Sequence, residues 1–409
     1  MKIAISTSVI QRGKTGVAQY VFALVRSLLE QDHEHEFHLL VLQEDLPLFD
    51  FVGDRMKIIP IAEKWRPAVK NIFWHQFVLP GWLKKEGIDV LHVPSYRRML
   101  WRAPCATIAT IHDLAPFHVK GKYDLARMIY GRVFVKWLAK RQDQIIAIST
   151  NTATDIQRFL GIPLERQRLI LNGLDHGRFH PAPSPSFPGL EHPYFLYISR
   201  LEHPAKNHVR LIEAFNQFKA KTGSPWLLAL GGSDWHGAEH IHAAAAASPF
   251  AADIRFLGFV KDADLPDLYR SAAAFVYPSL FEGFGMPPVE AMACGCPVIS
   301  SAAGSLAEVI GNAARVIDPE SVDSLFQALQ ALHSSPTTRR RLVDAGLRNA
   351  RRFNWNTNAA QFLLTCRLVR RPPPVGGIVR GRTESDGPRV TPPSHVRLIA
   401  PLEPHSTPL

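Results

Sequence analysis

Two glutamates, Glu282 and Glu290, flank a short segment rich in glycine and proline. The apolar residues 273–277 before them predict a buried strand, and Pro287 and Pro288 suit the first turn of a helix, where N–H groups have no partner within the helix. In open α/β sheets, ligands bind at the loop that follows such a strand. One carboxylate can therefore face a reacting group while the other accepts hydrogen bonds from sugar hydroxyls.

This stretch resembles the signature of the retaining GT-B glycosyltransferases, specifically family 4. The matching positions, in the family's order, are Glu282, Gly283, Phe284, Gly285, Pro287, Glu290, Ala291, Met292, Ala293, Gly295 and Pro297. The resemblance implies an α/β protein of two Rossmann-like domains that face each other across a cleft. It places Glu282 nearest the reacting centre, either as nucleophile or by positioning the donor. It also implies that the backbone of Gly283–Gly285 binds the donor sugar and that Glu290 binds the ribose hydroxyls.

A basic pair follows the predicted strand 194–199. The segment Ser199–Asn207 resembles the site that binds the donor phosphates in this family. Arg200 can form a bidentate fork to a phosphate, and Lys206 adds a compact point charge. One more residue separates these two bases than in many members, so the resemblance defines the contact of Lys206 less closely than that of Arg200.

Two positions of the amino-terminal half complete the expected site. His112 ends a predicted strand and resembles the family's histidine at the cleft floor, which contacts the transferred sugar; the alternative is a core histidine. Gly16 begins a predicted helix and, by the resemblance, lies near the donor phosphate or the acceptor. The preceding turn is not a P-loop, because that motif needs a glycine where this chain has Ser8.

Short apolar strands alternate with helical patterns, which is typical of parallel βαβ units. The predicted strands are 2–7, 37–42, 57–61, 90–93, 107–112, 145–149, 169–171, 194–199, 226–230, 254–259, 273–277 and 298–300. The length of 409 residues suits two domains. The predicted organisation is an acceptor domain (1–180), a linker (181–193), a nucleotide-sugar domain (194–352), a helix crossing back to the first domain (353–370) and a proline-rich disordered tail (371–409).

The formal net charge of +11 favours anionic partners. No nucleic-acid-binding module is recognisable, so a phosphorylated donor and an anionic membrane face are the better candidates. The first residues read as a strand and not as a signal peptide, and no apolar run reaches the ~20 residues of a bilayer span. The four cysteines lack metal or disulfide spacing. We therefore expect a cytoplasmic protein, with peripheral contact at the inner face of the membrane left open.

Aromatic and basic residues interleave over residues 64–85. Such a segment can lie at a membrane interface and receive a lipid-linked acceptor. The alternative, which we prefer because family members carry a packed helix here, buries Ile72, Phe77, Val78 and Leu83 in the domain core.

No metal and no other cofactor is expected. Asp262 and Asp264 form an Asp-x-Asp sequence, which binds a divalent ion in another glycosyltransferase architecture. Asp264 is better placed as the cap of a helix over residues 265–271, however. The diphosphate charge would instead be met by Arg200, Lys206 and helix N-termini.

The resemblance, together with these features, implies a metal-independent retaining hexosyltransferase. It would move a sugar from a nucleotide-diphosphate donor to a glycan or lipid-linked acceptor in surface-polysaccharide biosynthesis. The run from His112 to Pro116 resembles mannosyltransferases of bacterial surface-polysaccharide assembly, including lipopolysaccharide, which puts GDP-mannose ahead of the UDP-sugars. The alternatives are a GT-B-fold sugar-nucleotide epimerase, which has no acceptor, and a non-catalytic sugar-nucleotide-binding protein.

Overall fold

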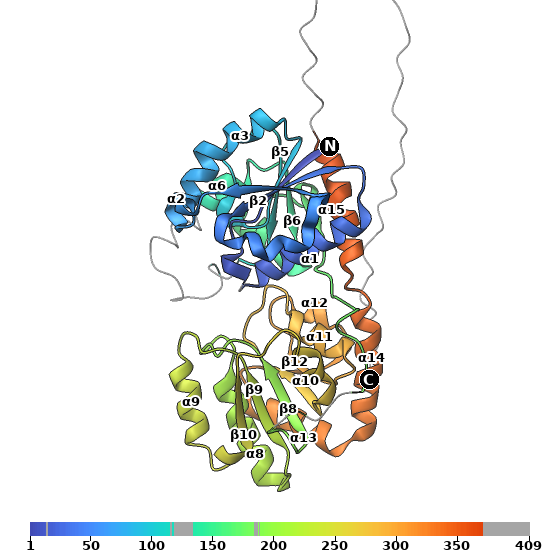
Figure 1. Cartoon of the computed structure of the whole chain (residues 1–409). Coiled ribbons are helices and arrows are strands. Elements are labelled where there is room, and N and C mark those ends of the chain that lie inside the picture. Colours follow the sequence, from blue (N-terminus) through green and yellow to red (C-terminus); the bar gives the residue numbers. More distant parts are fainter. Residues whose placement is uncertain (14, 115–116, 118–133, 184–186, 188, 371–409) are drawn as a thin grey trace, which may run out of the picture. The chain divides into compact units, whose positions relative to one another are not determined.

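A computed structural model describes residues 1–13, 15–114, 117, 134–183, 187 and 189–370. Residues 1–371 form one compact unit, and the predicted tail lies outside the described residues. The strands of the described part form two sheets (Figure 1). The first contains β1 (Lys2–Ser6), β2 (Glu36–Leu42), β3 (Lys57–Ile61), β4 (Val90–Val93), β5 (Ala106–Ile111), β6 (Gln144–Ala147) and β7 (Gln167–Leu169). The second contains β8 (Tyr194–Ile198), β9 (Leu227–Gly231), β10 (Ile254–Gly258), β11 (Ala274–Tyr277), β12 (Val298–Ser301) and β13 (Ala314–Ile317).

Both sheets are parallel throughout and both reverse their strand order beside their first strand. The order is β3-β2-β1-β4-β5-β6-β7 in the first sheet and β10-β9-β8-β11-β12-β13 in the second. The reversals lie between β1 and β4 and between β8 and β11. At such a point the connections leave to opposite sides, and ligands bind beyond the carboxyl ends of the strands. The loops after β8 and β11 are the ones that carry Arg200 and Glu282.

Helices connect strands in both sheets, and the last three helices of the described residues follow β13. Among the described residues of the first half they include α1 (Gly16–Gln31), α2 (Ala68–Phe73), a π-helical turn (Trp74–Val78), α3 (Leu79–Glu86), α6 (Val135–Ala139) and α7 (Thr150–Asp155). In the second half they are α8 (His208–Thr222), α9 (Ala238–Ala246), α10 (Leu265–Ser271), α11 (Met286–Ala293), α12 (Leu306–Ile310), α13 (Val322–Ser334), α14 (Pro336–Ala350) and α15 (Trp355–Val369).

Helix α15, the last in the described part of the chain, packs in the core of the first sheet although it follows the strands of the second. Its residues Ala359, Phe362 and Cys366 are buried in the same core as Ile3 and Leu24. The helix begins cleanly because the Asn354 side chain accepts hydrogen bonds from the first backbone N–H groups. In Figure 1, α15 lies beside α1.

Two local expectations are corrected. Phe77 and Val78 are 64% and 40% exposed, while Leu83 is buried, so only part of the segment 64–85 faces the core. Asp264 does precede α10, but its side chain makes no capping bond, because its backbone already has helical angles (φ −89°, ψ −17°). The Asp264 carboxylate therefore stabilises α10 at most through its charge.

Candidate active site

The loop between β11 and α11 is shaped by glycines that admit no side chain. Gly285 adopts φ +100°, and a Cβ at this position would collide with Leu306. At Gly283 a Cβ would lie 2.6 Å from the backbone oxygen of His112 and from Cβ of Asp113. The glycine therefore brings the loop that carries Glu282 into direct contact with the end of β5. Two of the predicted site positions, Gly283 and His112, meet in this way.

The carboxylate of Glu282 is held by two donors. Its Oε1 accepts hydrogen bonds from Nζ of Lys206, at 2.5 Å, and from the hydroxyl of Tyr277, at 2.8 Å. The ion pair is largely shielded, because the Lys206 and Glu282 side chains are only 15% and 14% exposed. Burial, and then the charge of Glu282, raises the pKa of Tyr277, so its hydroxyl keeps its proton and acts as the donor.

The loop after β8 is bonded to the loop after β11. The backbone N–H of Leu280 donates to the oxygen of Ala205 at 3.0 Å, and Nδ2 of Asn207 donates to the oxygen of Pro278 at 3.1 Å. Tyr197, at the end of β8, donates its hydroxyl to the oxygen of Lys206 at 2.7 Å. Lys206 is thus fixed through both its backbone and its ammonium group.

Arg200 is available to a ligand. Its side chain is 53% exposed, lies 3.3 Å from the carboxylate of Glu202 and covers the ring of Trp235 at 4.9 Å. The guanidinium is therefore oriented by neighbours, yet keeps donors for a phosphate. The structure brings Lys206 to Glu282, whereas Arg200 pairs with Glu202.

Glu290 lies on α11 and accepts a hydrogen bond, at 2.9 Å, from the hydroxyl of the fully buried Tyr269. Burial raises the pKa of Glu290 to about 7, and the hydrogen bond from Tyr269 and the charge of Arg178 oppose that rise. Glu290 therefore changes its charge near neutral pH. Phe284, by contrast, is buried against Phe353, so any contact it makes with a donor would come from its backbone.

His112 follows β5 and carries a neutral imidazole. Burial lowers its pKa to about 4, although the charge of Asp113 opposes the shift. Its Nε2 lies 3.2 Å from the oxygen of Pro94, and because a carbonyl can only accept, Nε2 must carry the proton. Nδ1 is then the nitrogen with the lone pair. The ring packs edge-on against Tyr20, 4.8 Å away.

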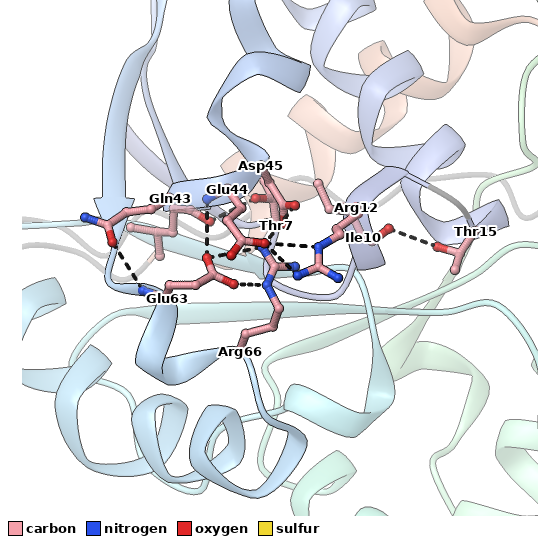
Figure 2. Close-up of polar contacts among 10 residues, drawn as sticks. Thr7, Ile10, Arg12, Thr15, Gln43, Glu44, Asp45, Glu63 and Arg66 are labelled. Atoms are coloured by element: carbon pink, nitrogen blue, oxygen red, sulfur yellow. Dashed lines mark hydrogen bonds and ion pairs between the residues drawn. The ribbon is translucent and has the colours of Figure 1, made fainter.

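Gly16 begins α1, and the turn before it is held by an ion pair of Arg12. Gln11 and Arg12 adopt left-handed backbone angles, and Arg12 pairs with Glu44 at 2.6 Å. Figure 2 shows Glu44 beside a second group, in which Arg66 binds both Glu63 and the buried carboxylate of Asp45. A Cβ at Gly16 would meet no atom within 4 Å, so this helix start has room beside it.

Several residues that support the site were not predicted from the sequence. The carbonyl of Gly283 accepts a hydrogen bond from Oγ of Ser305 at 2.7 Å, and Ser305 in turn meets Oγ of Ser149 at 2.8 Å. Gly304 packs against the backbone of Glu282. Ser149 follows β6 and Gly304 follows β12. Their positions after strand ends are the feature of the sequence that could have indicated them as residues of the site. The hydroxyl contact of Tyr277 had no signal beyond its place at the end of β11.

Comparisons with known proteins agree with this geometry. The family described as Glycosyltransferase Family 4 matches residues 14–178, and the one described as Glycosyl transferases group 1 matches residues 184–348. The chain belongs to glycosyltransferase family 4. Together the two matches cover every predicted site residue and all described strands except β1.

Individual proteins resemble this glycosyltransferase over most of its length. An O-antigen chain mannosyltransferase B of Escherichia coli is 27% identical over 90% of this chain and 100% of its own length. A phosphatidyl-myo-inositol mannosyltransferase of Mycolicibacterium smegmatis is 26% identical over 85% of this chain and 89% of its own length. The structure of Anabaena HepE in complex with UDP and glucose has a TM-score of 0.69 at 18% identity, over 90% of this chain and 100% of HepE. That structural likeness confirms the GT-B fold.

Proposed function

We propose that this glycosyltransferase is a retaining mannosyltransferase that takes mannose from GDP-mannose and adds it to a glycan or lipid-linked saccharide during surface-polysaccharide assembly. The observation that carries the proposal is the junction at Gly283, where the anchored carboxylate of Glu282 lies next to the strand end that bears His112. The names of the two mannosyltransferase relatives support mannose as the transferred sugar. The comparisons do not favour an epimerase.

The residues of the site suit the cleavage of a sugar–diphosphate bond. As the bond between the anomeric carbon and the phosphate oxygen breaks, negative charge grows on the leaving diphosphate. Arg200, Lys206 and the N-terminus of α11 supply fixed positive charge for it, so we propose that no metal is needed. The engagement of Glu282 Oε1 by two donors favours a positioning and electrostatic role over nucleophilic attack. The lone pair on Nδ1 of His112 can accept a hydrogen bond from a sugar hydroxyl.

Donor binding is expected to weaken at low pH through Glu290. In this proposal the ribose hydroxyls donate to its carboxylate, so protonation removes the negative charge that makes this group a strong acceptor. With a pKa of about 7, the ionised fraction falls roughly tenfold between about pH 8 and about pH 6. The Kd of GDP-mannose, measured by calorimetry, should rise by a similar factor. GDP-mannose is the ligand of choice, because the terminal phosphate of free GDP would itself titrate near about pH 6.

The matched variant for this measurement is Glu290→Gln. It should bind GDP-mannose less tightly at high pH and should show a flat profile, because its amide does not titrate. A wild-type Kd that stays constant from pH 8 to pH 6 would place the ribose contact elsewhere.

The proposed function is tested by a donor and acceptor screen. Thermal stabilisation is compared for GDP-mannose and UDP-sugars, since a ligand at 100 times its Kd adds roughly 2.7 kcal/mol. Mannose transfer is then followed with and without a saccharide acceptor, each in the presence and absence of EDTA. We expect stabilisation by GDP-mannose, acceptor-dependent turnover and full activity in EDTA. A preference for UDP-sugars would exclude the donor, and activity lost in EDTA and restored by Mn²⁺ would exclude the metal-independent mechanism.

A further inference from the structure

The amino-terminal half exposes large apolar side chains on consecutive helical turns. Val69 and Phe73 of α2 are 80% and 51% exposed, and Phe77 of the π-helical turn is 64% exposed. The opposite side of the same segment is buried, with Leu79 and Leu83 in the core. The exposed residues are therefore the outer side of a well-packed segment and not a sign of loose packing. Among monomeric proteins, a continuous apolar surface of this kind usually marks a contact site.

Trp65 and two further segments extend this surface. Trp65 stacks on Phe73, and Phe73 meets Phe77 at 4.7 Å. Gln76, between these aromatics, donates to the oxygen of Met99 and accepts from the N–H of Trp101, both at 2.9 Å. Trp101 in turn contacts Trp137 of α6 at 5.2 Å. We call this surface the aromatic–basic face; it comprises residues 64–85, 95–102 and 136–141.

The charges on this face have one sign. The three segments contain no aspartate or glutamate. Several of the bases lie over the aromatic rings: Nζ of Lys64 over Trp65, and Cζ of Arg141 over Trp137 at 3.7 Å. The exposed bases are Lys64, Lys70, Lys84, Lys85, Arg97, Arg102, Lys136, Lys140 and Arg141. The acids that flank the first segment, Glu63 and Glu86, are partly buried and pair with Arg66 and Lys57. A surface with exposed aromatic rings and a large excess of bases over acids matches the interfacial region of an anionic bilayer.

The face is bonded to the first sheet at its ligand-binding edge. The side chain of Asn71 in α2 accepts a hydrogen bond from Oγ of Ser8 at 3.2 Å, and His75 meets Oγ of Ser6 at 2.9 Å. Ser6 ends β1, and the loop that follows it leads to Gly16. A membrane held by this face would therefore lie against the helices that flank the carboxyl end of β1 in the acceptor half.

We propose that the aromatic–basic face seats the enzyme on an anionic lipid bilayer, with Phe73 and Phe77 inserted among the lipids and the surrounding bases on the headgroups. This inference builds on the proposed function, because a lipid-linked acceptor is presented at such a surface. None of the helices in the described part of the chain has the length and apolar composition to cross a bilayer. The attachment is accordingly peripheral, and salt should weaken it.

The test is sedimentation of the full chain with vesicles of phosphatidylcholine alone and of phosphatidylcholine mixed with phosphatidylglycerol. Wild-type protein should sediment with the mixed vesicles and not with the neutral ones. High salt should release the protein from the mixed vesicles. Combined Phe73→Ser and Phe77→Ser should lower the partition coefficient at least tenfold, because the inserted apolar area is lost. Combined Lys64→Gln and Lys70→Gln should lower it by roughly 30-fold.

Two control variants carry matched changes on other surfaces. Phe259→Ser removes a phenylalanine of the second half that is 75% exposed, and Arg340→Gln with Arg341→Gln removes two exposed bases of α14. Both should bind the mixed vesicles like the wild type. Equal binding by the Phe73/Phe77 variant and the wild type would overturn the proposal. The proposal would also be overturned if the wild-type protein bound no vesicles and the Phe73/Phe77 variant differed from it in oligomeric state. That result would mean that the face binds a second copy of the chain.

Transfer to a short water-soluble acceptor separates this proposal from the proposed function. If the protein transfers mannose to the soluble acceptor but does not bind vesicles as expected, only the membrane proposal is wrong. If vesicle binding behaves as expected and no mannose is transferred, only the function is wrong.

Discussion

Replacing Glu282 by glutamine is expected to lower kcat by roughly 10²–10³-fold, as does removal of a fixed electrostatic group at a reacting centre. Glutamine keeps the volume of the side chain and an oxygen that can accept from Tyr277, so the loss reports the charge. The Kd of GDP-mannose should change little, because Glu282 is not assigned to the nucleotide. Single-turnover kinetics and calorimetry on the same preparation measure the two quantities.

Two companion variants sharpen this result. Tyr277→Phe keeps a ring that packs 5.6 Å from that of Tyr197 and removes only the hydroxyl. It should lower kcat by roughly tenfold or more, the value of one hydrogen bond to a charged group. In a Lys206→Met background, Glu282→Gln should have a smaller effect than alone, because the partners act together. A weakened Kd with unchanged kcat would instead make Glu282 a donor-binding residue.

Replacing Gly283 by alanine is expected to lower kcat/KM by roughly 10²-fold, the cost of a displacement of about 1 Å at a reacting centre. The added Cβ would lie 2.6 Å from the backbone oxygen of His112, and a backbone atom cannot move aside as a flexible side chain can. The loop must therefore shift away from β5, which should also cost about 1–3 kcal/mol of the free energy of unfolding. Steady-state kinetics and urea denaturation measure both effects.

The control for this substitution is Gly81→Ala in α3. A Cβ there meets no atom within 4 Å, and alanine favours a helix over glycine by about 1 kcal/mol. Activity should be unchanged and stability equal or higher. Full activity in Gly283→Ala would mean that the close contact between the loop and β5 is not needed for transfer.

The strands were predictable because burial on both sides of a parallel sheet requires continuous apolar runs. Each of the twelve predicted strands is present, with ends that differ by at most two residues. β13 escaped prediction because it lies at the edge of its sheet, where Arg315 and Val316 are exposed and Ile317 alone is buried. Its sequence therefore lacks the continuous apolar run of the other strands.

The sequence allowed the residues of the site to be predicted, but not which of them bond to one another. The resemblance to the family's motifs indicated Arg200, Lys206 and Glu282, and their places in loops after strands put them at one edge of a sheet. The bond between Lys206 and Glu282 joins residues 76 positions apart, and its existence depends on how the two loops pack. The outward orientation of Phe77 was missed because the resemblance implied only a packed helix here. A π-helical turn over Trp74–Val78 changes which side chains of that helix face outward.

Because α15 contributes to the core of the amino-terminal half, that core can be completed only late in translation. Ala359, Phe362 and Cys366 fill the core beneath the first sheet, yet they are made after the whole second half. Part of the core of the amino-terminal half therefore stays exposed to solvent until these residues leave the ribosome. For the same reason, a chimera that combines this acceptor half with another donor half has to include residues 355–369 with the acceptor half.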